Sequence, residues 1–121
     1  MQYIGIDIIE ISRIQNAVDD WDDKFLRRVY TEREIELFQS KISSLAVRFA
    51  AKEAVMKALN AADLSMGFRN IEVLAEPDGK PFIRLYGMAD LQAQKLGIHE
   101  FAVSLSHSRE NAVAVVIGQP A

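Results

Sequence analysis

A long alanine-rich segment, residues 44–61, constrains the fold of this chain more than any other feature. It contains no Gly and no Pro and is apolar almost all the way round, so it is predicted to form a helix that is buried on most sides. The alanines around Glu53 predict close packing of this helix against a sheet. The rest of the chain must then supply that sheet.

A strand is predicted at the start of the chain. Residues 3–8 alternate in the manner of a half-buried strand. Its two faces carry Ile4, Ile6 and Ile8 on one side, and Tyr3, Gly5 and Asp7 on the other. Asp7 therefore follows Gly5 along one face of an otherwise apolar strand.

Three short helices are expected between this strand and the long helix. Apolar residues at helical spacing predict the first, and residues suited to capping mark where the other two begin. The predicted helices are 11–18, 24–30 with Asp22 or Asp23 as its cap, and one that the capping-box residues Thr31 and Glu34 begin and polar residues 39–43 end.

The second half of the chain is predicted to form two hairpin-like pairs of strands with a helix between them. Strand-forming runs flank turn-forming residues twice, and Gly97 is suited to end the intervening helix. The predicted strands are 70–74 and 81–85 around a turn at 77–80, and 101–106 and 112–117 around 107–111, with the helix at 88–96.

Length and composition limit the class of protein. The 121 residues suit a single domain spanning 1–121, and 50% apolar with 26% charged residues is typical of an ordinary globular protein. Without cysteine, disulfides, thiolate metal sites and cysteine nucleophiles are excluded. The chain starts without a signal-peptide pattern and has no membrane-spanning apolar run, so we expect a cytoplasmic protein without membrane contact. A net charge of −3 argues against general nucleic-acid binding.

Glu53 and Lys57 lie one turn apart on the same face of the predicted long helix. A surface ion pair is the simplest interpretation of this spacing, and such pairs are common. A carboxylate among closely packed alanines, however, is costly unless it is paired or bound to a metal. Glu53 is therefore a candidate ligand as well.

Asp7 is a second candidate ligand. One carboxylate from a strand and one from a helix form the sparse set that suits Mg²⁺, with water and substrate phosphates filling the other positions. A helix cap or a plain strand-end carboxylate is the alternative for Asp7.

Basic residues form two further candidate sites. His107 follows a predicted strand, where an imidazole could donate to a phosphate, although turns often carry His without a function. The early helices carry Arg13, Lys24, Arg27 and Arg28, with Phe25 as an apolar anchor, and could receive an acidic partner. Because Asp19, Asp20, Asp22 and Asp23 lie nearby, a merely solvated surface of mixed charge is an equal alternative.

Taken together, these segments resemble the holo-acyl-carrier-protein synthase family, the short single-domain branch of the phosphopantetheinyl transferases. The likeness spans nearly the whole chain. It is carried by residues 5–14 (GIDIIEISRI), by residues 48–58 (RFAAKEAVMKA) and, more loosely, by 71–114, which includes IEV at 71–73, GKP at 79–81 and VSLSHS at 103–108. The resemblance implies an α+β fold with a long helix packed on antiparallel strands, and a homotrimer with active sites between neighbouring subunits.

The resemblance also implies a reaction. Phosphopantetheine would pass from coenzyme A to a serine of an acyl carrier protein, with release of adenosine 3′,5′-bisphosphate. Asp7 and Glu53 would hold Mg²⁺ against the pyrophosphate, and Glu53 would accept the serine proton. Arg48, Lys57 and His107 would contact the phosphates of coenzyme A, while Arg13, together with Phe25 and Arg27, would meet the carrier protein.

Two departures from the family pattern affect this expectation. The family commonly continues after Lys57 through a Gly-Thr-Gly turn, whereas residues 58–62 here are predicted to prolong the helix. The connection at 39–45 is also shorter than is typical. Two rival functions stay open. The same two carboxylates and lysine could direct water in a Mg²⁺-dependent hydrolase of nucleotide pyrophosphates. The missing turn is the one hint of a non-catalytic module that binds carrier protein.

Overall fold

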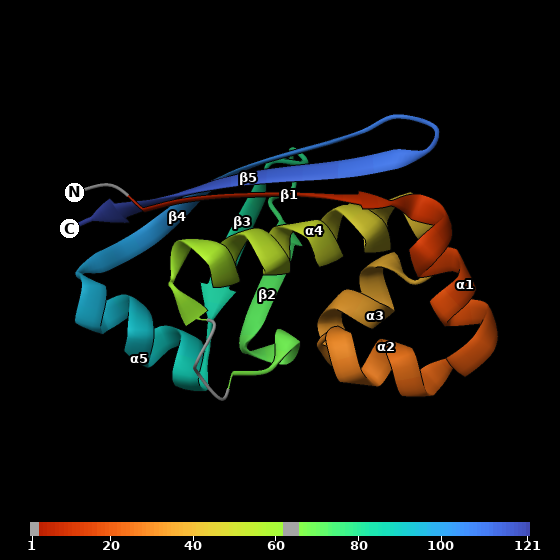
Figure 1. The fold of residues 1–121 in the computed structure, drawn as a ribbon, viewed down its shortest axis with the longest axis horizontal. Helices are drawn as coiled ribbons and strands as arrows, with labels where there is room; N and C mark the ends of the chain where they lie inside the picture. The colour runs from red at the N-terminus through yellow and green to blue at the C-terminus, as the bar shows by residue number, and fades with distance from the viewer. Residues whose placement is uncertain (1–2, 62–65) are drawn as a thin grey trace.

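The alanine-rich segment forms α4 (Ile42–Ala58), which lies against a three-stranded antiparallel sheet in a computed structural model that describes residues 3–61 and 66–121 (Figure 1). As predicted, this helix is buried along most of its length and packs on a sheet. Its buried residues are Leu45, Ala46, Val47, Arg48, Ala50, Ala51, Lys52, Ala54, Val55 and Ala58.

The end of α4 differs from the prediction. The helix stops at Ala58, and Asn60 adopts a left-handed conformation with φ of 55°. The predicted prolongation is therefore wrong at Leu59 and Asn60, while Ala62 lies outside the described residues. Asn tolerates this conformation better than most residues, because its short side chain bonds locally.

The sheet has the order β1-β5-β4, with β1 (Tyr3–Glu10) and β4 (Ile98–His107) on either side of β5 (Asn111–Pro120). Ala114 of β5 pairs with Asp7 on one side and with Leu105 on the other. Paired residues of antiparallel strands share a face, so Asp7 lies on the same face as the buried Ala114. That face is covered by α4.

The alternation of β1 is confirmed, but its isoleucines point away from the helix. Ile4, Ile6 and Ile8 are 58%, 59% and 66% exposed, whereas Gly5 and Ile9 are buried. Alternation identifies two faces but cannot say which one the helix covers. The outer face of this sheet is therefore strongly apolar and exposed in a single chain.

Three helices lie beyond one end of α4, namely α1 (Ile11–Trp21), α2 (Asp23–Val29) and α3 (Glu32–Phe38) (Figure 1). The predicted capping box is confirmed, because the Glu34 amide donates to Thr31 Oγ1 and the Thr31 amide donates to Glu34 Oε1. Asp22 occupies the cap position of α2, but its side chain makes no capping hydrogen bond.

The second half of the chain follows the predicted order. A 3-10 turn, η2 (Phe68–Asn70), leads into the hairpin of β2 (Ile71–Ala75) and β3 (Pro81–Leu85), and α5 (Gly87–Leu96) follows. Gly97 ends α5 with the expected left-handed φ of 76°. Across the described ranges, no helix has both the length and the apolar character needed to cross a membrane.

Candidate active site

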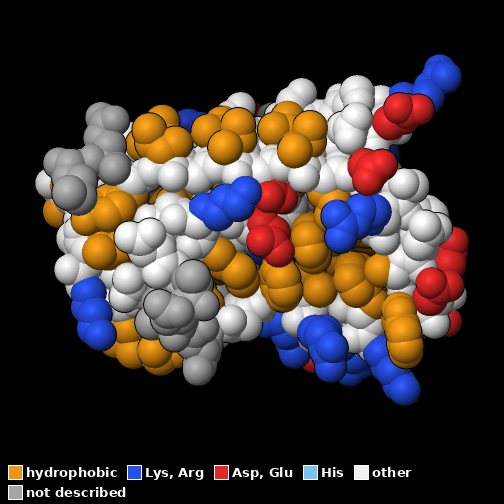
Figure 2. Space-filling model, in the orientation of Figure 1, with side chains coloured by type: hydrophobic (Ala, Val, Ile, Leu, Met, Phe, Trp, Pro, Cys, Tyr) orange, Lys and Arg blue, Asp and Glu red, His pale blue; other side chains and the backbone are white. Residues whose placement is uncertain are grey.

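Asp7, Glu53 and Lys57 come together where β1 crosses α4. Lys57 Nζ lies 3.0 Å from Asp7 Oδ1 and also donates to the carbonyl oxygen of Ile6 at 3.0 Å. Figure 2 shows acidic and basic side chains gathered over this part of α4, below a row of hydrophobic side chains along the sheet. The sequence placed these three residues on two separate elements, and the fold brings them to one site.

A surface hollow of about 520 Å³ adjoins this cluster, lined by Glu53, Met56, Lys57, Asn60 and Ala61. The simple ion pair between Glu53 and Lys57 is not present. Among the described residues, Lys57 pairs only with Asp7. The lysine thus joins the strand to the helix instead of bridging two turns of one helix.

A close backbone contact makes this meeting possible. A β-carbon built on Gly5 would lie 1.8 Å from the carbonyl oxygen of Ala54, a distance that no real side chain tolerates. Glycine at this position therefore lets β1 lie directly on the backbone of α4. Asp7, two residues further on the same face, is thereby held within reach of Lys57.

The charges in the cluster oppose one another. Burial raises the pKa of Glu53, and the negative charge of Asp7 raises it further, while Lys57 and Arg13 lower it. Arg13 of α1 thus acts on this site from a third element. A bound cation would relieve the burial and the like charge that oppose ionisation of Glu53.

The carboxylates of this cluster are the candidate donors for a metal ion. Within the described ranges, no group of three or more His, Asp or Glu residues could hold a metal. Mg²⁺ is nevertheless often bound by one or two carboxylates, with water and substrate phosphates completing its octahedron. Asp7 and Glu53 therefore fit Mg²⁺ in the presence of a phosphate substrate, but not as a closed protein cage.

Arg48 does not lie in this cluster. Its side chain is 6% exposed, and its guanidinium donates to the carbonyl oxygens of Val73 (3.1 Å) and Ser44 (3.3 Å) and lies over the ring of Phe38. Burial lowers its pKa. The bond from Nε to Val73 fastens α4 to β2, whereas Nη2 makes no hydrogen bond to a described residue, so the contact with coenzyme A stays a prediction.

His107 lies at the end of β4, exposed, with its Nδ1 3.2 Å from the carbonyl oxygen of Ser108. It pairs with Ala112, two residues from the partner of Asp7, and so shares the sheet face that carries Asp7. Strand spacings place the two backbone positions roughly 12 Å apart. His107 and Asp7 are therefore on one face of the sheet, separated by the width of β5.

Phe25 and Arg27 line a second hollow, of about 670 Å³, on α1 and α2. Trp21 is 62% exposed beside it. The hollow combines apolar side chains with three cations, and its complete lining is Ala17, Trp21, Lys24, Phe25, Arg27 and Arg28. Arg13, predicted to act with Phe25 and Arg27, also places its charge near Glu53, and its contact with the carrier stays a prediction.

Sequence reasoning missed a buried ion pair between Glu34 and Lys52, whose side chains are both 0% exposed. Glu34 was interpreted only as a capping-box residue. The available signal was Lys52 itself, which stands among the same buried alanines as Glu53.

Comparison with known proteins identifies the family of this chain. Residues 3–116 match the family model described as the 4′-phosphopantetheinyl transferase superfamily. The holo-[acyl-carrier-protein] synthase of Dehalococcoides mccartyi is 49% identical, covering 98% of this chain and 99% of its own, and that of Herpetosiphon aurantiacus is 45% identical, covering 98% of each.

Solved structures show the same fold. The Helicobacter pylori holo-[acyl-carrier-protein] synthase in complex with coenzyme A has a TM-score of 0.86 and 36% identity, covering 96% of this chain and 99% of its own. The Bacillus anthracis enzyme in complex with coenzyme A (3′,5′-ADP) has a TM-score of 0.77 and 34% identity, covering 98% and 96%. This chain therefore belongs to the 4′-phosphopantetheinyl transferase superfamily, as one of its holo-[acyl-carrier-protein] synthases.

Proposed function

We propose that the enzyme transfers 4′-phosphopantetheine from coenzyme A to a serine of an apo acyl carrier protein and releases adenosine 3′,5′-bisphosphate in a Mg²⁺-dependent reaction. The observation that carries this proposal is the meeting of Asp7, Glu53 and Lys57 beside an open hollow. Relatives named holo-[acyl-carrier-protein] synthase, two of them solved with coenzyme A or a part of it, support the choice of substrates.

Asp7 and Glu53 are the residues that would hold the metal. When bound, Mg²⁺ would neutralise pyrophosphate charge and bring the diphosphate to the edge of α4. Lys57 Nζ lies 3.0 Å from Asp7 Oδ1, and its side chain is exposed. The lysine can therefore move from Asp7 to contact a phosphate oxygen. Charge in this cluster would thus be redistributed when the diphosphate arrives.

The chemical step needs a base and a stabilised leaving group. The carrier serine Oγ would attack the β-phosphorus, forming a new P–O bond as the bond to the bridging oxygen of the leaving nucleotide breaks. Glu53, whose pKa is raised by burial and by Asp7, is suited to accept the serine proton directly or through a water. Lys57 would offset the charge that develops on the departing phosphate.

The remaining nucleotide contacts are assigned less directly. His107 is exposed on the same sheet face as Asp7, which suits contact with a different phosphate of the same coenzyme A. The contact expected of Arg48 stays a prediction, because its bond to Val73 joins α4 to β2 and its bond to Ser44 stays within α4.

The carrier protein would dock on α1 and α2. Phe25 and Trp21 offer apolar surface, and Lys24, Arg27 and Arg28 surround it with positive charge. An acidic helix with a few apolar side chains is the partner that this surface complements. Arg13 of α1 is close enough for its charge to act on Glu53, so it could contact the carrier near the reacting serine.

A homotrimer is the assembly that we propose. Ile4, Ile6 and Ile8 present an apolar outer face on β1, and Ile117 of the neighbouring β5 is 38% exposed beside them. Exposed apolar surface of this kind is typical of an interface. A neighbouring copy could then complete the nucleotide site, and the cytoplasmic location and single domain inferred from the sequence stay predictions.

The test is product analysis with coenzyme A, an apo acyl carrier protein and Mg²⁺. Intact mass spectrometry should show the carrier gaining a phosphopantetheine group, with an equal amount of adenosine 3′,5′-bisphosphate, and EDTA should abolish both products. Cleavage of coenzyme A with an unmodified carrier would instead indicate a hydrolase. Carrier binding without any turnover would indicate an assembly module.

A further inference from the structure

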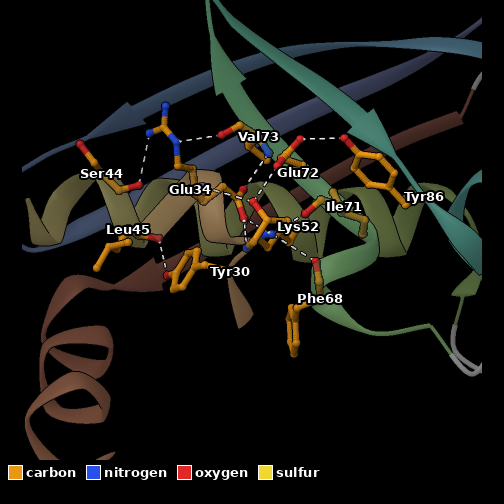
Figure 3. Close-up of polar contacts among 12 residues, drawn as sticks. Tyr30, Glu34, Ser44, Leu45, Lys52, Phe68, Ile71, Glu72, Val73 and Tyr86 are labelled. Atoms are coloured by element: carbon orange, nitrogen blue, oxygen red, sulfur yellow. Dashed lines mark hydrogen bonds and ion pairs between the residues drawn. The ribbon is translucent and has the colours of Figure 1, made fainter. Parts of the chain in front are cut away.

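Glu34 and Lys52 form a completely buried ion pair outside the catalytic cluster. Lys52 Nζ lies 2.7 Å from Glu34 Oε1, and both side chains are 0% exposed. Lys52 also donates to the carbonyl oxygens of Phe68 (3.1 Å) and Ile71. Figure 3 shows Lys52 pointing from α4 into the space that Glu34, Phe68 and Ile71 enclose. All three protons of the ammonium group are therefore used.

Both carboxylate oxygens of Glu34 also accept hydrogen bonds from the backbone. Its Oε1 accepts from the Thr31 amide at 2.8 Å, and its Oε2 accepts from the Val73 amide at 2.7 Å. Within the described part of the chain, no buried side-chain nitrogen or oxygen lacks a partner. The pair thus joins α3, α4, η2 and β2 through bonds that are all satisfied.

Stability alone does not account for such a pair. Moving two charges out of water is expensive, and well-packed apolar residues of similar volume often stabilise a fold as well or better. Charge-assisted hydrogen bonds do, however, fix the direction and position of both side chains more tightly than apolar contacts can. The pair is therefore better suited to set a geometry than to increase stability.

The geometry that it sets is the rotation of α4. Lys52 directly precedes Glu53, and successive residues of a helix point about 100° apart. With Lys52 anchored on one side and Gly5 in contact with the Ala54 backbone on the other, the helix is held between two fixed points. The directions of Glu53 and Lys57 toward β1 follow from that constraint.

Small rotations matter at this site. A turn of roughly 10° about the helix axis moves a carboxylate some way out on its side chain by about 1 Å, given the helix dimensions. A misplacement of about 1 Å in a catalytic group can cost about 100-fold in rate.

We infer that Glu34 and Lys52 are positioning residues for the transfer reaction: they hold α4 in the one rotation that aims Glu53 and Lys57 at Asp7. This inference rests on the proposed function. Neither residue touches the hollow at the active site, so both would act only through the helix.

The variants to compare are Lys52→Met and Glu34→Gln. The first keeps an unbranched side chain one atom shorter and removes its charge, while the second keeps the shape and one acceptor oxygen. Phe101→Ala is the matched control, because Phe101 of β4 is also buried, at 8% exposure, but lies away from the active site. It is four residues from Leu105, the β4 residue aligned with Asp7 across the sheet. Each protein is assayed below its own unfolding transition, where circular dichroism shows a native population.

Two measurements separate positioning from loss of fold. The first is kcat for carrier modification, and the second is the affinity for Mn²⁺ in the presence of coenzyme A, measured by electron paramagnetic resonance. We expect Lys52→Met to lower kcat at least about tenfold relative to Phe101→Ala and to weaken Mn²⁺ binding several-fold. Glu34→Gln should change both in the same direction, to a smaller extent.

The inference is overturned if the pair variants are folded and match Phe101→Ala in both measurements. If Lys52→Met does not fold, Glu34→Gln decides by the same comparison. Failure of the wild-type protein to modify the carrier would contradict the proposed function instead, so the two failures are distinguishable.

Discussion

Lys52 and Glu53 are neighbours in α4, yet Lys52 is completely buried and paired, whereas Glu53 lines an open hollow and faces the like charge of Asp7. The two sides of α4 therefore differ in function. One side is fastened to the interior by charge-assisted bonds, and the other presents strained charges to a substrate. This division explains why so short a chain can hold a phosphate-transfer site.

Replacing Gly5 by Ala should separate β1 from α4. The added methyl group meets a backbone carbonyl that cannot move aside, so we expect a loss of about 3 kcal/mol of unfolding free energy. Activity should fall further than the folded fraction does, because Asp7 moves away from Lys57. Chemical denaturation and a transfer assay measure the two effects. Gly67→Ala is the control, since nothing lies within 4 Å of its added carbon.

Glu53→Gln should remove most of the turnover while the protein stays folded. The amide can neither accept the serine proton nor replace the carboxylate charge, so kcat should fall at least about 100-fold. Steady-state assays of carrier modification check this result. A variant that retains wild-type kcat would contradict the role given to Glu53.

The same substitution should reveal the electrostatic strain of the site. A pKa raised in the folded state means that the ionised Glu53 destabilises the fold, so wild-type stability falls as the pH rises from the ordinary Glu pKa through the raised one. Without metal, Glu53→Gln should therefore gain melting temperature over the wild type at pH 7 and little or nothing at pH 4. Glu36→Gln, at an exposed position, is the control. An equal difference at both pH values would show that no such strain exists.

A charge on the outer face of the sheet should break the assembly. Ile6→Glu places a carboxylate at the centre of the apolar row, where burial against another copy would be costly. We expect light scattering to report a monomer in place of a trimer, with loss of activity. Leu37→Glu changes a residue that is 56% exposed on α3 and should leave the trimer intact. A monomeric wild-type protein with full activity would refute the assembly.

Reversing a charge on the proposed carrier-binding surface of α1 and α2 should change the KM for one substrate only. Arg27→Glu is expected to raise the KM for carrier protein about tenfold, more at low salt, and to leave the KM for coenzyme A unchanged. Arg33→Glu, exposed on α3, provides the comparison. Arg13 is less suitable for this test, because its charge also acts on Glu53.

Much of the fold follows from local pattern. The alternation of β1, the capping box at Thr31 and the left-handed Gly97 are each set by neighbours in the sequence, and all three were predicted correctly. The side of β1 that α4 covers was not predictable, because it depends on how closely Gly5 approaches Ala54. The prolongation of the long helix past Ala58 was wrong, because helix propensity does not show where a chain must turn back.

The residues of the candidate site could likewise be predicted only in part. Asp7, Glu53 and Lys57 were identified from the residues, but only the fold shows that Lys57 pairs with Asp7 instead of Glu53. Lys52 could not be assigned, because its partners come from Glu34, Phe68 and Ile71, which are distant in sequence. A buried lysine is recognised by the groups around it, and these are set by tertiary structure.

The central claim is that Asp7 and Glu53 act as one unit. A double-mutant cycle in single-turnover carrier modification tests it, using Asp7→Asn, Glu53→Gln and the combined variant with saturating coenzyme A and Mg²⁺. We predict that each single variant loses nearly all activity and that the combination is scarcely slower than either. If the rate losses of the two single variants multiply in the combined variant, the claim is contradicted. Two carboxylates that bind one ion should not contribute independently to the rate.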